Sequence, residues 1–200
     1  VSNGPKESRG IWYLPANETN WVKANGFKDG KGFDLEDPNY RKVIGRGEEN
    51  VLFATVNLPD TKMSTRIAVA DDIDSEVQAQ SGLYMMYLDP ESGLPQGDHF
   101  KQIAGVRTAD SGNEYAQAFR QISDVDFEPT GKGTYRIAVS TRMVRSGTTL
   151  IEGGVYVSEN ISSDLETNAP FADFTLLRNH PDAVGVALGS GGSVYAAFGH

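Results

Sequence analysis

The chain contains no cysteine, so disulfides, thiol catalysis and thiolate metal sites are excluded. No apolar run approaches the ~20 residues that a membrane-spanning helix needs, and we therefore expect no membrane insertion. Basic residues are also few, since 18 Lys and Arg stand against 27 Asp and Glu, for a formal net charge of -9. Nucleic-acid binding depends on clustered basic residues, so this balance argues against nucleic acid as a partner.

The composition that remains is typical of a turn-rich all-β protein. The 200 residues include 22 Gly and 10% aromatic residues, with only 22% charged residues. We predict an extended N-terminal arm at 1–9 and a single β-sandwich domain at 10–200. The sandwich is expected to be of the jelly-roll type, with about ten short strands and a long N-terminal loop region at Asn17–Asn39.

Alternation of apolar and polar residues is clearest at Thr134–Val144, which predicts a half-buried strand whose Arg136 side faces water. By contrast, Val51–Leu58, Thr65–Ala70 and Leu83–Leu88 are apolar on both faces, so we expect them to lie between layers or at a subunit contact. Further strands are expected at Gly10–Leu14, Tyr40–Ile44, Lys101–Arg107, Phe171–Leu177, Val184–Leu188 and Val194–Phe198.

Two local features refine this pattern. A hairpin turn is predicted at Arg145–Thr148, and Gly153-Gly154 should interrupt the returning strand as a bulge or a close backbone contact. The segment Ser111–Glu128 fits helical spacing in its first half and strict alternation in its second half. We expect one strand to continue through the whole segment.

Three carboxylates alternate with apolar residues in Asp124-Val125-Asp126-Phe127-Glu128, which places all three on one face of a strand. The segment resembles the active-site strand of the family 16 jelly-roll glycoside hydrolases, which reads Glu-x-Asp-x-Glu. That resemblance implies Asp124 as nucleophile, Asp126 as a charge-tuning helper and Glu128 as general acid. Here Asp stands where the family has its nucleophilic Glu. The other interpretation is a solvated strand face.

A glycine-punctuated acidic stretch follows Asn25. Calcium needs several oxygen ligands on a chain that curls around the ion, which makes this loop the candidate Ca²⁺ site. Its piece Gly30–Leu35 is similar to one RTX-type repeat unit, although a single copy is present. A plain acidic turn is the alternative, as it is for the second acidic cluster at Asp71–Glu76. The candidate ligands in the loop are Asp29, Asp34, Glu36 and Asp37.

Aromatic residues concentrate in the first forty residues beside Asn, Asp and Lys. Sugar faces stack on aromatic rings while their hydroxyls bind polar groups, so this region is a candidate carbohydrate-binding site. The alternative is that the rings anchor a long loop onto the core. A strand that looks like those of many carbohydrate-binding modules lies at Gly133–Val139. The candidate ligand-binding residues are Trp12, Tyr13, Trp21 and Tyr40.

Three function classes remain open. We favour a non-enzymatic structural or attachment subunit of a virion or cell-surface assembly, with surface glycan as a further partner and no required cofactor. The apolar C-terminal pair of strands within Val184–Phe198 suggests burial against another subunit, and hence a homo-oligomer or assembly neighbours. The alternatives are a carbohydrate-binding module of an extracellular enzyme and a family 16-like glycoside hydrolase. All three predict an extracellular or virion-surface location.

Overall fold

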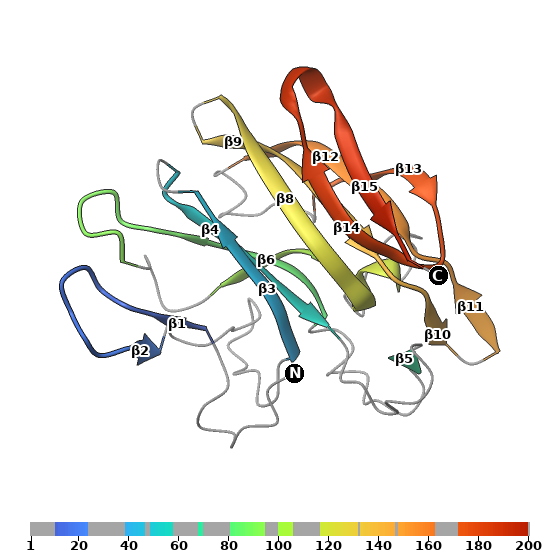
Figure 1. Cartoon of the computed structure of the whole chain (residues 1–200), viewed down its shortest axis with the longest axis horizontal. Coiled ribbons are helices and arrows are strands. Elements are labelled where there is room, and N and C mark those ends of the chain that lie inside the picture. Colours follow the sequence, from blue (N-terminus) through green and yellow to red (C-terminus); the bar gives the residue numbers. More distant parts are fainter. Residues whose placement is uncertain are drawn as a thin grey trace.

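The chain is an all-β protein whose strands form several antiparallel sheets (Figure 1). A computed structural model describes residues 11–23, 39–46, 49–57, 68–69, 81–94, 100–105, 117–131, 133–146, 148–162 and 172–199. The strands are β1 Trp12–Tyr13, β2 Val22–Lys23, β3 Asn39–Gly45, β4 Val51–Asn57, β5 Ala68–Val69, β6 Gly82–Tyr87, β7 Lys101–Gly105, β8 Ile122–Gly131, β9 Thr134–Thr141, β10 Val144–Ser146, β11 Thr149–Ile151, β12 Gly154–Ser162, β13 Thr175–Asn179, β14 Ala183–Leu188 and β15 Val194–Phe198.

Two four-stranded sheets carry most of the structure. One has the order β3-β4-β6-β7 and the other β13-β12-β9-β8, and every neighbouring pair within them is antiparallel. Strands that are close in sequence are therefore neighbours in space, which is the arrangement of a meander. Two-stranded hairpins, β1-β2 and β14-β15, accompany the sheets, and β5 pairs in parallel with β10.

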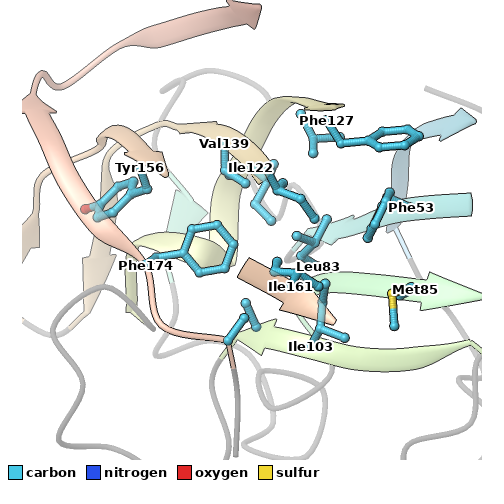
Figure 2. Packing of buried hydrophobic residues seen from close by; sticks show 14 of the residues in the cluster. Phe53, Leu83, Met85, Ile103, Ile122, Phe127, Val139, Tyr156, Ile161 and Phe174 are labelled. Carbon is cyan, nitrogen blue, oxygen red and sulfur yellow. The ribbon is translucent and has the colours of Figure 1, made fainter. Parts of the chain in front are cut away.

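The main hydrophobic cluster draws side chains from both four-stranded sheets (Figure 2). Phe53 of β4 meets Phe127 of β8 with ring centroids 4.8 Å apart. Leu83 of β6 and Ile137 of β9 belong to the same cluster, and both are fully buried. Side chains alternate between the two faces of a strand, so each of these strands contributes the residues of one face to the cluster. Both four-stranded sheets therefore contribute to a single hydrophobic cluster.

The central strands β4 and β6 are apolar on both faces because both faces are covered. Phe53 and Leu83 face the main cluster, whereas Ala54 and Tyr84 belong to a second cluster completed by Ile11, Phe100 and the partly buried Tyr13. Within the described part of the chain, β4 and β6 are thus buried on both faces, whereas most of the third strand of this kind, Thr65–Ala70, lies outside the described residues. Their apolar outer face contacts the protein's own β1 segment.

The prediction that one side of β9, the side of Arg136, faces water is wrong. Arg136, Ala138 and Ser140 are all buried, with at most 7% of their surface exposed. The β14-β15 hairpin covers this outer face, where Ala138 packs with Val186 and with Val155 of β12. An alternating pattern shows which side chains share a face, but it cannot show that a later segment of the chain covers the polar one.

The expected continuous strand through Ser111–Glu128 is also wrong at its centre. A 3₁₀ turn at Phe119–Gln121 precedes β8, and its residues are buried. The side chain of Asn57 receives a bond from the N–H of Ile122 (3.0 Å) and donates to the carbonyl of Ile122 (2.8 Å). Asn57 thus imitates a neighbouring strand at the point where β8 begins.

The predicted hairpin and its glycine interruption are confirmed. Strands β10 and β11 pair through Ser146 and Thr149, and β12 starts at Gly154. A Cβ atom at Gly153 would collide with the carbonyl oxygen of Thr141. Gly153 is therefore needed because two backbone segments approach closely at this position.

Candidate functional site

The acidic strand face predicted at β8 is present. Val125 and Phe127 are fully buried in the main cluster, while Asp124, Asp126 and Glu128 lie on the opposite face. The three carboxylates are partly covered, with exposed side-chain fractions of 22%, 15% and 31%. The face interpreted as solvated is therefore only partly open to water.

Asp124 joins three parts of the chain. Its Oδ1 atom forms an ion pair with Nζ of Lys42, which lies on β3. Its Oδ2 atom accepts a hydrogen bond from the backbone N–H of Val186 on β14, at 3.1 Å. The carboxylate thus links an edge strand of one sheet, an edge strand of the other and the C-terminal hairpin.

Asp126 repeats this arrangement two residues further along β8. Its Oδ1 atom binds Nη2 of Arg46 at 2.9 Å, and its Oδ2 atom accepts the N–H of Leu188 at 2.8 Å. The guanidinium of Arg46 also lies 5.3 Å from the centre of the Phe127 ring, within the range of a cation–π contact.

The spacing of these two bonds has a simple geometric cause. Asp124 and Asp126 lie on the same face of β8, and Val186 and Leu188 present their N–H groups on the same side of β14. The N–H groups of β14 therefore donate hydrogen bonds to carboxylate oxygens. In a regular sheet, the same N–H groups would donate to the carbonyl oxygens of a neighbouring strand. Hydrogen bonds to charged groups contribute about 1.5–3 kcal/mol each, more than bonds between neutral groups.

Glu128 is engaged through Arg136, which lies opposite it on β9. Nη1 of Arg136 binds Glu128 at 3.2 Å, and Nε binds Glu159 of β12 at 3.0 Å. Nη2 of Arg136 donates to the carbonyl of Gly192 in the turn between β14 and β15, at 2.9 Å. A buried guanidinium needs such partners on several sides, and this one holds the tip of the hairpin against the sheet.

The acidic face can thus be described as a docking surface for a hairpin. Each carboxylate of the trio has a cationic partner, and two of them also bind β14 amides. Sequence reasoning found the three carboxylates but missed their partners Lys42, Arg46 and Arg136. The first two are four residues apart in an extended segment, which was the available signal. Their pairing with carboxylates 82 and 80 residues away could not be predicted from the local sequence.

Tyr135, within the strand that looks like those of carbohydrate-binding modules, is a core residue. It is 4% exposed, and its ring contacts Phe53 and Phe127 with centroids 5.9 and 5.8 Å away. Burial raises the pKa of its hydroxyl to about 12, and the charge of Glu49 and a hydrogen bond to that carboxylate act in the same direction.

The aromatic candidates lie mainly on the β1-β2 hairpin. Trp12 pairs with Lys23 and Tyr13 with Val22. Exposure alternates along β1, because Tyr13 packs against the second hydrophobic cluster while Trp12 is 38% and Leu14 is 44% exposed. Trp21, just before β2, is 61% exposed. Tyr13 therefore anchors the hairpin to the core. The fourth candidate, Tyr40, lies on β3 and not on this hairpin.

Trp12 is the Cα partner of Lys23, and opposite positions of an antiparallel pair belong to the same face of the hairpin. Trp21 is two residues before Lys23 and returns to that same face. The diagonal distance between Cα atoms in such a pair is about 7–8 Å, close enough for two indole rings to form one surface. We call Trp12, Leu14 and Trp21 the hairpin patch.

The predicted calcium ligands Asp29, Asp34, Glu36 and Asp37 lie outside the described residues, as does the cluster at Asp71–Glu76. Among the residues that the structure does describe, no group of three or more His, Asp or Glu side chains could hold a metal ion. The described elements also include no helix long and apolar enough to span a bilayer.

Comparison of the chain with protein-family models, with curated proteins and with solved structures finds no match in any of the three. The function must therefore be inferred from the hairpin patch and the acidic face themselves.

Proposed function

We propose that the protein is a non-enzymatic structural or attachment subunit on the surface of a virion or a cell, and that it binds surface glycans through the hairpin patch. The observation that carries this proposal is the exposure of Trp12 (38%) and Trp21 (61%) on one face of a short hairpin. Large aromatic side chains are usually buried, and exposed apolar groups that gather in one place often mark interaction sites.

The chemistry of the patch favours carbohydrate. An indole ring offers a flat apolar face on which the C–H groups of a pyranose can stack, and its N–H can donate to a hydroxyl. Asn17, Thr19 and Asn20 lie between the two tryptophans in sequence and are exposed polar residues of the same hairpin connection. Tyr13, on the same hairpin, packs against the second hydrophobic cluster and so attaches the hairpin to the core.

The acidic face supports a structural rather than a catalytic role for Asp124, Asp126 and Glu128. A catalytic pair must leave one carboxyl free to protonate a leaving group and another free to attack or to activate water. Here Asp124 and Asp126 accept β14 amides and pair with cations, and Glu128 pairs with a buried Arg136. A reducing-sugar assay against β-glucans and galactans tests the hydrolase alternative, because activity lost in Glu128→Gln would establish it.

The architecture that we propose is a β-sandwich of the two four-stranded sheets. The support for it is the single hydrophobic cluster to which both sheets contribute. Within each sheet, strands follow one another in sequence. In a jelly roll, successive strands alternate between the two sheets, so the observed order favours stacked meanders over the jelly-roll type.

A carbohydrate-binding module of an extracellular enzyme is the second candidate, and the same hairpin patch favours it. The two roles differ in ligand: an attachment subunit recognises glycans of a host or neighbouring cell, whereas such a module recognises the polysaccharide that its enzyme degrades. Calcium at Asp29–Asp37 would be compatible with either role.

A glycan array that contains both cell-surface glycans and polysaccharides tests the proposal. We expect binding that Trp21→Ala abolishes and Trp12→Ala weakens at least about tenfold, because each variant removes a stacking ring. Trp21→Phe should retain part of the binding. Leu150→Ala is the matched control, since Leu150 is 48% exposed but lies on β11, away from the hairpin. Silence across the array, or binding unaffected by both alanine variants, would contradict the proposal.

A further inference from the structure

We propose that two copies of the chain pair through the outer edge of β15, antiparallel and about a two-fold axis at Ala196. This inference deepens the proposed function and rests on it, since a subunit of a surface assembly needs a contact between copies. The contact joins β14-β15 of one copy to β15-β14 of the other as a four-stranded sheet.

The β14-β15 hairpin offers one open edge. On one side β14 pairs with β15, and on its other side the N–H groups of Val186 and Leu188 donate to Asp124 and Asp126. No strand in the described part of the chain pairs with the outer side of β15. With respect to the described residues, the N–H and C=O groups on that side are thus those of an open sheet edge, which can pair with another strand.

The open edge is held in a fixed position before any partner arrives. Arg136 binds the carbonyl of Gly192 at the tip of the hairpin. At the other end, the ring of Phe198 lies 4.5 Å from that of His180 and 5.0 Å from the guanidinium carbon of Arg178. Pairing with a pre-ordered strand requires little further loss of conformational entropy.

The composition of β15 lacks the usual protection against edge pairing. Exposed edges commonly carry a charged residue, a proline or a bulge. The strand reads Val-Tyr-Ala-Ala-Phe and contains neither charge nor proline. The edge strand β13 differs, because it carries Arg178 and has a bulge in its pairing with β12.

The absence of charge on β15 also favours this strand as the contact between two copies. Each chain carries a formal net charge of -9, so copies repel one another unless their contact keeps the charges apart. Tyr195, Ala196 and Ala197 are all exposed, and each is uncharged. A second copy of this neutral strand therefore brings no charged side chain into the contact.

The order of large and small side chains fits a two-fold pairing centred on Ala196. A two-fold axis perpendicular to a sheet keeps each residue on its own face, so one residue must lie directly opposite its own copy, with the axis between the two. With Ala196 there, Tyr195 lies opposite Ala197 of the partner subunit, and Val194 lies opposite Phe198 of the partner subunit. Tyr195 is 65% exposed and gains a small neighbour over which its ring can pack.

The pair of five-residue strands is smaller than a standard stable interface, which buries about 1,600 Å². We therefore expect weak association that increases with concentration. Sedimentation equilibrium over a concentration series of the full chain measures it. The wild type should reach a dimer, and a wild type that stays monomeric at the highest concentration would overturn the proposal.

Charge variants at the axis test the register. Ala196→Lys and Ala196→Glu place like charges directly opposite each other, which should weaken self-association at least about tenfold. An equimolar mixture should restore the dimer, because Lys then faces Glu. Ala187→Lys is the matched control, since it adds the same charge at an exposed position of the inner strand β14. It should leave association unchanged.

Self-association of Ala196→Lys equal to that of the wild type would overturn the contact. Failure of the mixture to restore a dimer would overturn the axis at Ala196. The monomeric variants separate this inference from the proposed function, because glycan binding by Trp12 and Trp21 does not depend on pairing. Glycan binding without a dimer contradicts only the β15 contact, and a dimer without glycan binding contradicts only the proposed ligand.

Discussion

Replacing Asp126 with alanine tests whether the acidic face holds the C-terminal hairpin. The side chain accepts the N–H of Leu188 at 2.8 Å and pairs with Arg46 at 2.9 Å. Its exposed fraction is 15%, so little water is available to replace these partners. The substitution leaves the amide of Leu188 without its acceptor and removes the negative charge beside Arg46.

The magnitude follows from the two contacts. A charge-assisted bond to a backbone amide contributes about 1.5–3 kcal/mol. The Arg46 side chain is 46% exposed, so its ion pair adds at most about 1 kcal/mol after screening by solvent. We expect Asp126→Ala to lower the free energy of unfolding by about 2–4 kcal/mol. Asp126→Asn keeps an oxygen for Leu188 and should cost about half as much.

Urea denaturation measures the total effect, and amide hydrogen exchange at Leu188 and Val186 locates it. Thr130→Ala is the control, since Thr130 also lies on β8 but is exposed. We expect faster exchange at Leu188 in Asp126→Ala and almost no change in the control. A loss below about 1 kcal/mol, together with unchanged exchange at Leu188, would refute the reasoning.

Three further outcomes are expected. Stability should fall as pH rises from about 10 to about 12, because the unfolded tyrosine ionises before the buried Tyr135; a urea-midpoint series in which Tyr135→Phe declines equally would contradict this. Asn57→Ala should cost on the order of 3 kcal/mol in urea unfolding, since both backbone groups of Ile122 lose a partner, and a cost near zero would remove the role assigned to Asn57. Gly153→Ala should lower the melting temperature because its Cβ meets the Thr141 carbonyl, and an unchanged melting temperature would show that the approach can relax.

Local sequence patterns predicted the strands well where the hydrophobic pattern of a segment alone determined its structure. The expected strand Val194–Phe198 has the bounds of β15, and the all-apolar strands lie within the sheets as expected. The interruption at Gly153-Gly154 also followed from local chemistry, because only glycine tolerates that close backbone contact.

Long-range contacts were beyond local patterns. Arg136 looked solvent-facing because the strand alternates, yet the hairpin that covers it begins 47 residues later, at Ala183. Phe119–Gln121 was expected to continue a strand, but it forms a buried turn beside the Asn57 clamp on Ile122. In both cases the structure depends on contacts between segments that are distant in the sequence. The pattern of a single sequence does not reveal such contacts.

The candidate sites divide in the same way. The alternation of residues along a strand predicted that Asp124, Asp126 and Glu128 share a face. It did not predict the cationic side chains and backbone amides that bind these carboxylates. The concentration of aromatic residues pointed to the hairpin patch. It could not show that Tyr13 packs against the second hydrophobic cluster while Trp12 is exposed.

The two tryptophans of the chain, Trp12 and Trp21, both belong to the hairpin patch. Intrinsic tryptophan fluorescence therefore reports on the proposed glycan site alone. Titration with a glycan that binds on the array should shift the emission to shorter wavelength and saturate, as sugar displaces water from the rings. Emission that stays unchanged while that glycan binds would contradict the hairpin patch as the binding site.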